Sequence, residues 1–236
     1  ISVASGIKAA TLTSGARTDG WQEKANYFSE FHDAGRTPEY AGSAIDPAGI
    51  IDLTGLMRED GTLEWKAPKG LWVILRVATE STGGKIKHGR KECDKMSSGA
   101  AVLHWKSYPG RIIDTLSRYG LKPLGVTMDS HEAGPQNWTP EFKEIFLRHN
   151  GYDITPFLPA MRGYVVGDNA ATGQFLSDLR RTIADTITDE YYGTFDSLCR
   201  DAGVEFTAQA TGNGLSLGAD NISAKRAVGK PQGEFW

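Results

Sequence analysis

The second half of the chain alternates between two hydrophobic patterns, one typical of strands and the other typical of helices. An apolar run at 124–128 and an alternating run at 204–210 predict strands, and a last strand is predicted at 232–236. Apolar positions three and four residues apart predict three helices, at 97–119, 142–150 and 173–202. Pro109 is expected to kink or split the first of them. Strands and helices in this order predict a parallel sheet with right-handed crossovers.

Residues 1–80 show a different pattern, in which short apolar runs are separated by turn signals. Residues 59–61 predict a hairpin-type turn, and residues 71–77 predict a strand that is too apolar to be half exposed. The first residues indicate no clear element, and we interpret 13–49 as loops and short strands of a sandwich. The fold class is therefore α/β, with a β-rich, sandwich-like segment at 1–80 before part of a (β/α) barrel at 81–236. Because a full barrel takes about 250 residues, we expect an incomplete barrel and a segment of a longer protein.

Composition narrows the class of protein. Of the 236 residues, 39% are hydrophobic and 23% are charged, which is typical of a globular protein. The formal net charge of -3 gives no electrostatic footprint for nucleic acid, and no apolar run is long enough to span a bilayer. Cys93 and Cys199 are too few for a disulfide framework, so two buried free thiols are expected, although a single bridge between them stays an alternative.

The stretch 128–140, MDSHEAGPQNWTP, carries the densest candidate chemistry. It places two carboxylates, an imidazole, two amides and an indole just after a predicted strand: Asp129, Glu132, His131, Gln136, Asn137 and Trp138. Ligands of parallel α/β folds bind at the carboxyl ends of strands, and paired carboxylates with aromatic and amide groups suit the binding and cleavage of a sugar. The alternative is that these are turn, cap and core residues, with Thr139 as the cap of the next helix.

Two other strand ends supply further candidates. Alternation along 204–210 gives Gln209 the polar parity at the carboxyl end of its strand, and Glu234 ends the last strand, followed by Trp236. If these side chains meet Asp129 and Glu132, they fit the acid and base of glycoside hydrolysis. They equally fit ligands of a hard cation such as calcium. The sequence has no Cys/His metal spacing, GxSxG, GxGxxG or Walker loop.

Several blocks resemble glycoside hydrolase family 106, the α-L-rhamnosidases. They occur in the family's order and cover most of the chain from about residue 50 onward: IDLTGLM (51–57), ECDK (92–95), MDSHEAGPQNWTPEFKEIFLRHNGYD (128–153), FLSDLRRTIAD (175–185), YYGTFDSLCRDAG (191–203) and GEFW (233–236). The resemblance implies a (β/α)8 TIM-barrel catalytic domain flanked by β-sandwich domains. It also implies hydrolysis of terminal α-L-rhamnose with inversion, helped by calcium, and favours a periplasmic or secreted enzyme.

The resemblance also assigns roles to single residues. Glu132 matches the acid of the family's D-S-W-E block and Asp129 matches its Asp, while Glu234 matches the acid of the G-E-F-W block. We expect Glu132 and Glu234 as catalytic groups and Glu234 and Asp129 as calcium ligands, and the sequence leaves open whether Glu234 is base or ligand. His131 stands where the family has Trp, and Gln209 stands where it has Glu.

Sugar contacts are expected from seven residues: Asp129, His131, Gln136, Asn137, Trp138, Gln209 and Trp236. The expected partner is a rhamnose-containing carbohydrate. Two alternatives stay open, namely a glycosidase for another deoxyhexose and a non-catalytic or fragmentary carbohydrate-binding relative.

Overall fold

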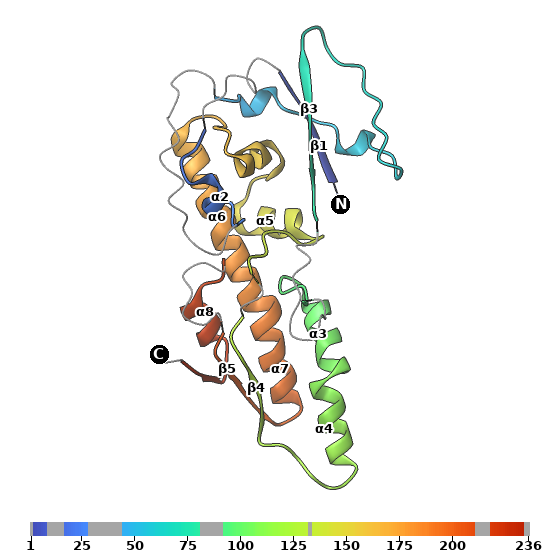
Figure 1. The fold of residues 1–236 in the computed structure, drawn as a ribbon, viewed down its shortest axis with the longest axis vertical. Helices are drawn as coiled ribbons and strands as arrows, with labels where there is room; N and C mark the ends of the chain where they lie inside the picture. Colours follow the sequence, from blue (N-terminus) through green and yellow to red (C-terminus); the bar gives the residue numbers. More distant parts are fainter. Residues whose placement is uncertain are drawn as a thin grey trace. The chain divides into compact units, whose positions relative to one another are not determined.

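A computed structural model of the chain describes residues 2–8, 17–27, 44–80, 92–131, 134–210 and 218–233 (Figure 1). The chain divides into two units, each built from separate stretches of sequence. The first unit comprises Ile1–Ala25, His32–Ser81 and Pro140–Leu179, and the second comprises Asn26–Phe31, Thr82–Thr139 and Arg180–Trp236. Both helices and strands are present, so the chain is mixed α/β.

An antiparallel sheet forms part of the first unit, with β1 (Ser2–Lys8) between β2 (Ile51–Asp52) and β3 (Trp72–Ala78). The expectation that the first residues form no element was wrong, because β1 is the central strand. Its small residues hide the strand from sequence patterns but permit close packing. A Cβ added at Gly6 would lie 2.8 Å from a ring carbon of Trp65.

The strand β3 lies where it was predicted, but its exposure was not as expected. None of its side chains is fully buried, and Ile74 is 45% exposed. The turn at 59–61 is confirmed, since the Arg58 N–H donates to the Thr62 carbonyl and Met57 forms an antiparallel bridge with Leu63.

The rest of the first unit packs short helices around aromatic side chains. They are α2 (Trp21–Lys24), η1 (Pro47–Gly49), η2 (Thr54–Leu56), α5 (Phe142–Asn150), η4 (Thr155–Arg162) and the start of α6 (Asn169–Ile187). The helix predicted at 142–150 is confirmed, and it ends at Gly151, whose φ of 76° is the left-handed conformation that favours glycine. Phe146 is fully buried between the rings of Tyr152 and Phe175.

The second unit contains the predicted parallel sheet, in the order β4 (Gly125–Met128), β5 (Glu205–Ala208) and β6 (Lys230–Pro231). The parallel pairing and the alternation along β5 are both confirmed. Phe206 and Ala208 are buried, Glu205 is exposed, and the Phe206 ring stacks on Phe195 at 6.0 Å. The third strand, β6, lies at 230–231, directly before the strand predicted at 232–236. Residues 234–236 lie outside the described residues.

The helices of this unit are α3 (Ser98–Ser107), α4 (Pro109–Ser117), α7 (Thr194–Asp201) and α8 (Asn221–Arg226). Pro109 splits the first predicted helix, and Ser97 caps it by accepting a hydrogen bond from the Ala100 N–H. The predicted helix at 173–202 is formed by α6 and α7, but a π-helical turn, η5 (Thr188–Gly193), separates them. Neither this turn nor α8 was expected.

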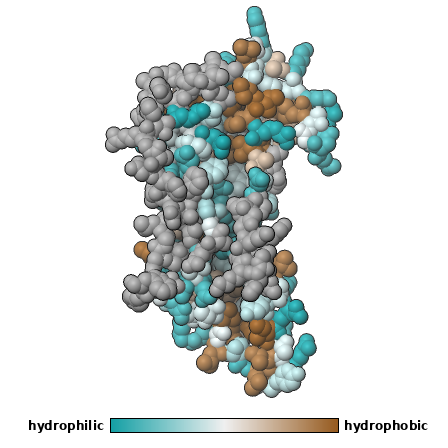
Figure 2. Space-filling view, viewed as in Figure 1, coloured by the Kyte–Doolittle hydropathy of each residue, from teal (hydrophilic) through white to brown (hydrophobic). Residues whose placement is uncertain are grey.

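Apolar side chains reach the surface over β3 in the first unit and over α4 in the second (Figure 2). Leu124, just before β4, is 91% exposed, which is unusual at a parallel sheet because such sheets are normally buried on both faces. Cys93 and Cys199 are free, as expected, but only Cys199 is buried, whereas Cys93 is half-buried. Within the described ranges, no helix has the length and apolar character needed to span a membrane.

Candidate active site

The loops that follow β4 and β5 are joined by hydrogen bonds at the carboxyl end of the sheet. The Ser130 N–H donates to Gln209 Oε1 at 2.9 Å, and the His131 N–H donates to the Ala210 carbonyl at 2.8 Å. Asp129 directly follows β4, and its side chain is exposed. Three predicted site residues, Asp129, His131 and Gln209, therefore lie at neighbouring strand ends, and Gln209 holds the loop that carries the other two.

Three other predicted site residues, Glu132, Glu234 and Trp236, lie outside the described residues. Their roles stay predictions.

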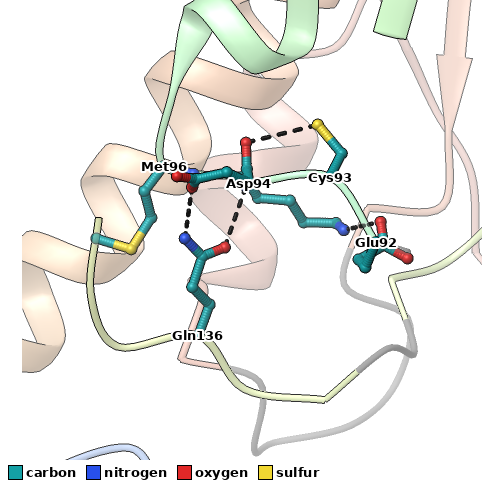
Figure 3. A network of polar contacts seen from close by, with 6 residues as sticks. Glu92, Cys93, Asp94, Met96 and Gln136 are labelled. Atoms are coloured by element: carbon teal, nitrogen blue, oxygen red, sulfur yellow. Dashed lines mark hydrogen bonds and ion pairs between the residues drawn. The ribbon is translucent and has the colours of Figure 1, made fainter. Parts of the chain in front are cut away.

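Gln136 connects two segments that are about forty positions apart in the sequence (Figure 3). Its Oε1 accepts a hydrogen bond from the Lys95 N–H at 3.0 Å, and its Nε2 donates to Asp94 Oδ1 and, at 3.2 Å, to the Trp138 carbonyl. The Asn26 amide also donates to the Gln136 carbonyl, at 2.9 Å. Both amide hydrogens are in use, so these contacts give Gln136 a structural role and no support for the predicted sugar contact.

Asp94 receives hydrogen bonds from both sides of this network. The Met96 N–H donates to Oδ1 at 2.9 Å, and the buried Thr139 hydroxyl donates to Oδ2 at 2.8 Å. The expectation that Thr139 caps the next helix was wrong. Glu141 occupies the cap position of α5 and makes no side-chain cap hydrogen bond, while the Thr139 hydroxyl donates to Asp94. Asn137 and Trp138, between these anchored positions, are half-buried.

An ion pair lies beside this network, between Glu92 Oε1 and Lys95 Nζ. Burial by itself raises the pKa of the Glu92 carboxyl, but the hydrogen bond and charge of Lys95 outweigh it and bring the pKa below its ordinary value. Glu92 is therefore an anion at neutral pH. The Lys95 ammonium also lies 5.2 Å from the centre of the Tyr191 ring, which η5 supplies.

His131 is buried and uncharged at neutral pH. Burial, reinforced by the charge of Lys95, lowers its pKa to about 4, against the opposing effects of Glu92 and of a hydrogen bond with the Gly134 main chain. Its Nδ1 has no hydrogen-bond partner among the described residues. The same holds for the hydroxyl of Tyr192, a fully buried residue whose pKa is raised by burial.

The described residues do not by themselves form a metal site. Within the ranges that the structure covers, no three His, Cys, Asp or Glu side chains are grouped closely enough to hold a metal ion. Asp129 is the only predicted calcium ligand among the described residues, and Gln209 Oε1 already accepts the Ser130 N–H. Calcium therefore stays a prediction, and no step proposed below depends on it.

Sequence patterns missed Lys95 as a buried residue, because lysine is mostly exposed and its pairing is set by tertiary contacts. The signal that could have indicated it was the ECDK block at 92–95, which contains both Glu92 and Lys95.

Comparison with known proteins decides the family. The model of the family described as alpha-L-rhamnosidase, glycoside hydrolase family 106, matches residues 6–236. The chain belongs to this family. The resemblance seen in the sequence blocks is thereby confirmed.

Two individual relatives extend the comparison. The solved structure of a rhamnosidase from Novosphingobium sp. PP1Y is similar to 88% of the present chain, with a TM-score of 0.75 and 28% sequence identity. A protein of Formosa agariphila named "Putative beta-glucuronidase" is 37% identical over 173 residues, or 71% of the chain. The chain spans 21% of the first relative's length and 15% of the second's.

Proposed function

We propose that the chain is part of an enzyme that hydrolyses terminal α-L-rhamnosyl linkages with inversion of configuration. The observation that carries the proposal is the family match over residues 6–236, supported by the likeness to a solved rhamnosidase. The position of Asp129 and His131 at the carboxyl end of a parallel strand supports it as well, since this is where α/β enzymes bind substrates.

The sheet β4-β5-β6 is proposed to be part of a (β/α)8 barrel. Its strands are parallel and are connected through helices, as barrel strands are. The high exposure of Leu124 and of Gly125 in β4 supports this, because a neighbouring strand and its helix would cover such an edge. The β-rich segment at 1–80 is proposed to belong to a sandwich-like domain.

Within this enzyme, Glu132 is proposed as the general acid that protonates the leaving-group oxygen. A second carboxylate, with Glu234 as the candidate, would activate water on the opposite face of the sugar. Glu132 follows His131, whose main-chain N–H donates to the Ala210 carbonyl. Glu234 is alternatively a calcium ligand, which would bind sugar hydroxyls together with Asp129.

A glucuronidase is the second candidate function, because the Formosa agariphila relative is named as one. A uronic acid carries a carboxylate and needs an available cation. Of the lysines and arginines that the structure describes, only Lys95 is buried, and its charge is already paired with Glu92.

The full-length protein should be assayed with aryl α-L-rhamnosides and aryl β-D-glucuronides in parallel. We expect release of the aryl group from the rhamnoside, with the β-anomer of rhamnose as first product by NMR. Hydrolysis of the glucuronide alone would replace the proposal with the second candidate. If neither of these substrates nor any other aryl deoxyhexoside is hydrolysed, the non-catalytic carbohydrate-binding alternative remains.

A further inference from the structure

The ion pair between Glu92 and Lys95 is unequally exposed. The Lys95 side chain is 4% exposed, whereas the Glu92 side chain is 27% exposed. Burying a lysine costs free energy that burying a hydrophobic residue would not cost, so a gain in stability does not by itself explain the pair. The arrangement nevertheless has a chemical result. Lys95 lies behind the carboxylate and keeps it ionised, while the carboxylate keeps lone pairs that can accept hydrogen bonds from a ligand.

The surroundings of this pair contain buried polar atoms without partners. Tyr191 lies under the Lys95 ammonium, and the Tyr192 ring is 5.3 Å from the Tyr191 ring. The Tyr192 hydroxyl and His131 Nδ1 have no hydrogen-bond partner in the described part of the chain, although Tyr192 is 0% and His131 6% exposed. Unpaired buried polar groups are rare because each costs free energy, so a group of them indicates a place that receives a ligand or water.

The local backbone agrees with a binding role. Tyr191 and Tyr192 are on the π-helical turn η5, a conformation that occurs frequently at functional sites. The same turn is tied to the start of α3, because the Ser98 N–H donates to Glu190 Oε2 at 2.9 Å. The charge of Glu92 also reaches Tyr192 and helps to raise the pKa of its hydroxyl, which keeps that hydroxyl protonated as a donor.

We propose that Glu92 and the Tyr192 hydroxyl form a subsite that binds hydroxyl groups of the sugar, with Lys95 as a positioning residue that holds the Glu92 carboxylate. A sugar hydroxyl donates to Glu92, and the Tyr192 O–H donates to the same or a neighbouring sugar oxygen. His131 Nδ1 supplies a further acceptor at the strand end. The inference rests on the proposed function, which it deepens by naming further residues that bind the substrate.

The test uses the full-length protein and the variants Glu92→Gln and Tyr192→Phe. L-Rhamnose binding is measured by calorimetry, and KM and kcat are measured with an aryl α-L-rhamnoside. Glu92→Gln should raise the L-rhamnose Kd and the KM about tenfold to a hundredfold, because it weakens a hydrogen bond to a charged group, and Tyr192→Phe about three- to tenfold. The kcat should stay near wild type, since the contact is made in both ground and transition states.

Matched controls separate binding from folding. Tyr152→Phe removes a hydroxyl that donates to Asp178 Oδ2 at 3.1 Å in the first unit, and Glu64→Gln removes the carboxylate of an exposed ion pair with Arg58. Both controls should leave KM unchanged. Tyr192→Phe should not lower the melting temperature, because it removes a buried hydroxyl that has no partner.

Lys95 is tested through Glu92. Lys95→Met should raise KM with little change in kcat, and the double variant with Glu92→Gln should have the KM of Glu92→Gln alone, because both changes remove one interaction. A purely structural role for Lys95 would instead give additive losses and lower kcat as well.

The outcomes distinguish the two proposals. Wild-type Kd and KM in both Glu92→Gln and Tyr192→Phe would overturn the subsite and leave the rhamnosidase proposal intact. If the wild type binds D-glucuronate but not L-rhamnose, the proposed function is overturned and the same variants are titrated with D-glucuronate, where unchanged affinity again overturns the subsite. A wild type that binds neither sugar overturns both.

Discussion

Replacing Gln136 by methionine tests whether its amide holds the segments at 92–98 and 134–139 together. Methionine keeps the length of the side chain but has no amide. The variant loses the acceptor for the Lys95 N–H, a donor to the Asp94 carboxylate and the longer bond to the Trp138 carbonyl. A neutral hydrogen bond contributes about 1 kcal/mol net and one to a charged group about 1.5–3 kcal/mol. Because Asp94 keeps its bonds from Met96 and Thr139, we expect a local loss of about 2–3 kcal/mol.

Hydrogen exchange followed by mass spectrometry measures this loss in the full-length protein. Amides at 92–98 should exchange about 30- to 150-fold faster in Gln136→Met, since each 1.4 kcal/mol of opening free energy changes the exchange rate tenfold. Gln174→Met is the control, because Gln174 is exposed and its Nε2 donates to Asp178 on the same helix, in the other unit of the chain. It should leave the exchange at 92–98 unchanged. Equal exchange in wild type and Gln136→Met would refute the bracing role.

Three further predictions concern the strand ends. Because burial lowers the pKa of His131 from 6.5 to about 4, the unfolded chain takes up a proton between these values that the folded chain does not. The free energy of unfolding should therefore fall as the pH drops from 6.5 to 4, by about 3 kcal/mol in total, and denaturant titrations should show a smaller fall in His131→Gln. Glu132→Gln should lower kcat about a hundredfold or more, with a smaller loss on aryl substrates that have good leaving groups, and wild-type turnover would end its assignment as the acid. Gln209→Glu should tighten calcium binding in calorimetric titrations because it adds a carboxylate, and an unchanged affinity would place residue 209 outside the coordination sphere.

The elements whose signals are local could be predicted from the sequence. Pro109 lacks a donor and splits the helix, Gly151 adopts the left-handed cap, and the alternation along 204–210 gives the buried face of β5. The strand at 2–8 could not, because its small residues have no period and its place depends on pairing with β3 more than sixty positions away.

The candidate site residues also divide into those with a local sequence signal and those whose contacts depend on distant parts of the chain. Asp129, His131 and Gln209 were predicted as site residues from their places at strand ends, and the structure places them at the ends of adjacent strands. The contacts of Gln136 and Thr139 were missed because their partner, Asp94, is 42 and 45 positions away, and the residue types equally suit a turn or a cap. Tertiary hydrogen bonds decided between these uses, and no local pattern contains that information.

The π-helical turn at Thr188–Gly193 makes the length of this helix a determinant of the site. Its hydrogen bonds enclose one residue more than those of an α-helix, and each residue of an α-helix turns the chain by about 100°. Deleting one residue between 188 and 193 would let the helix continue in regular α-helical register. The residues within the turn would then take new directions, and a residue other than Tyr191 would face the Lys95 ammonium. A single-residue deletion here is therefore expected to change ligand binding more than most substitutions on the same helix.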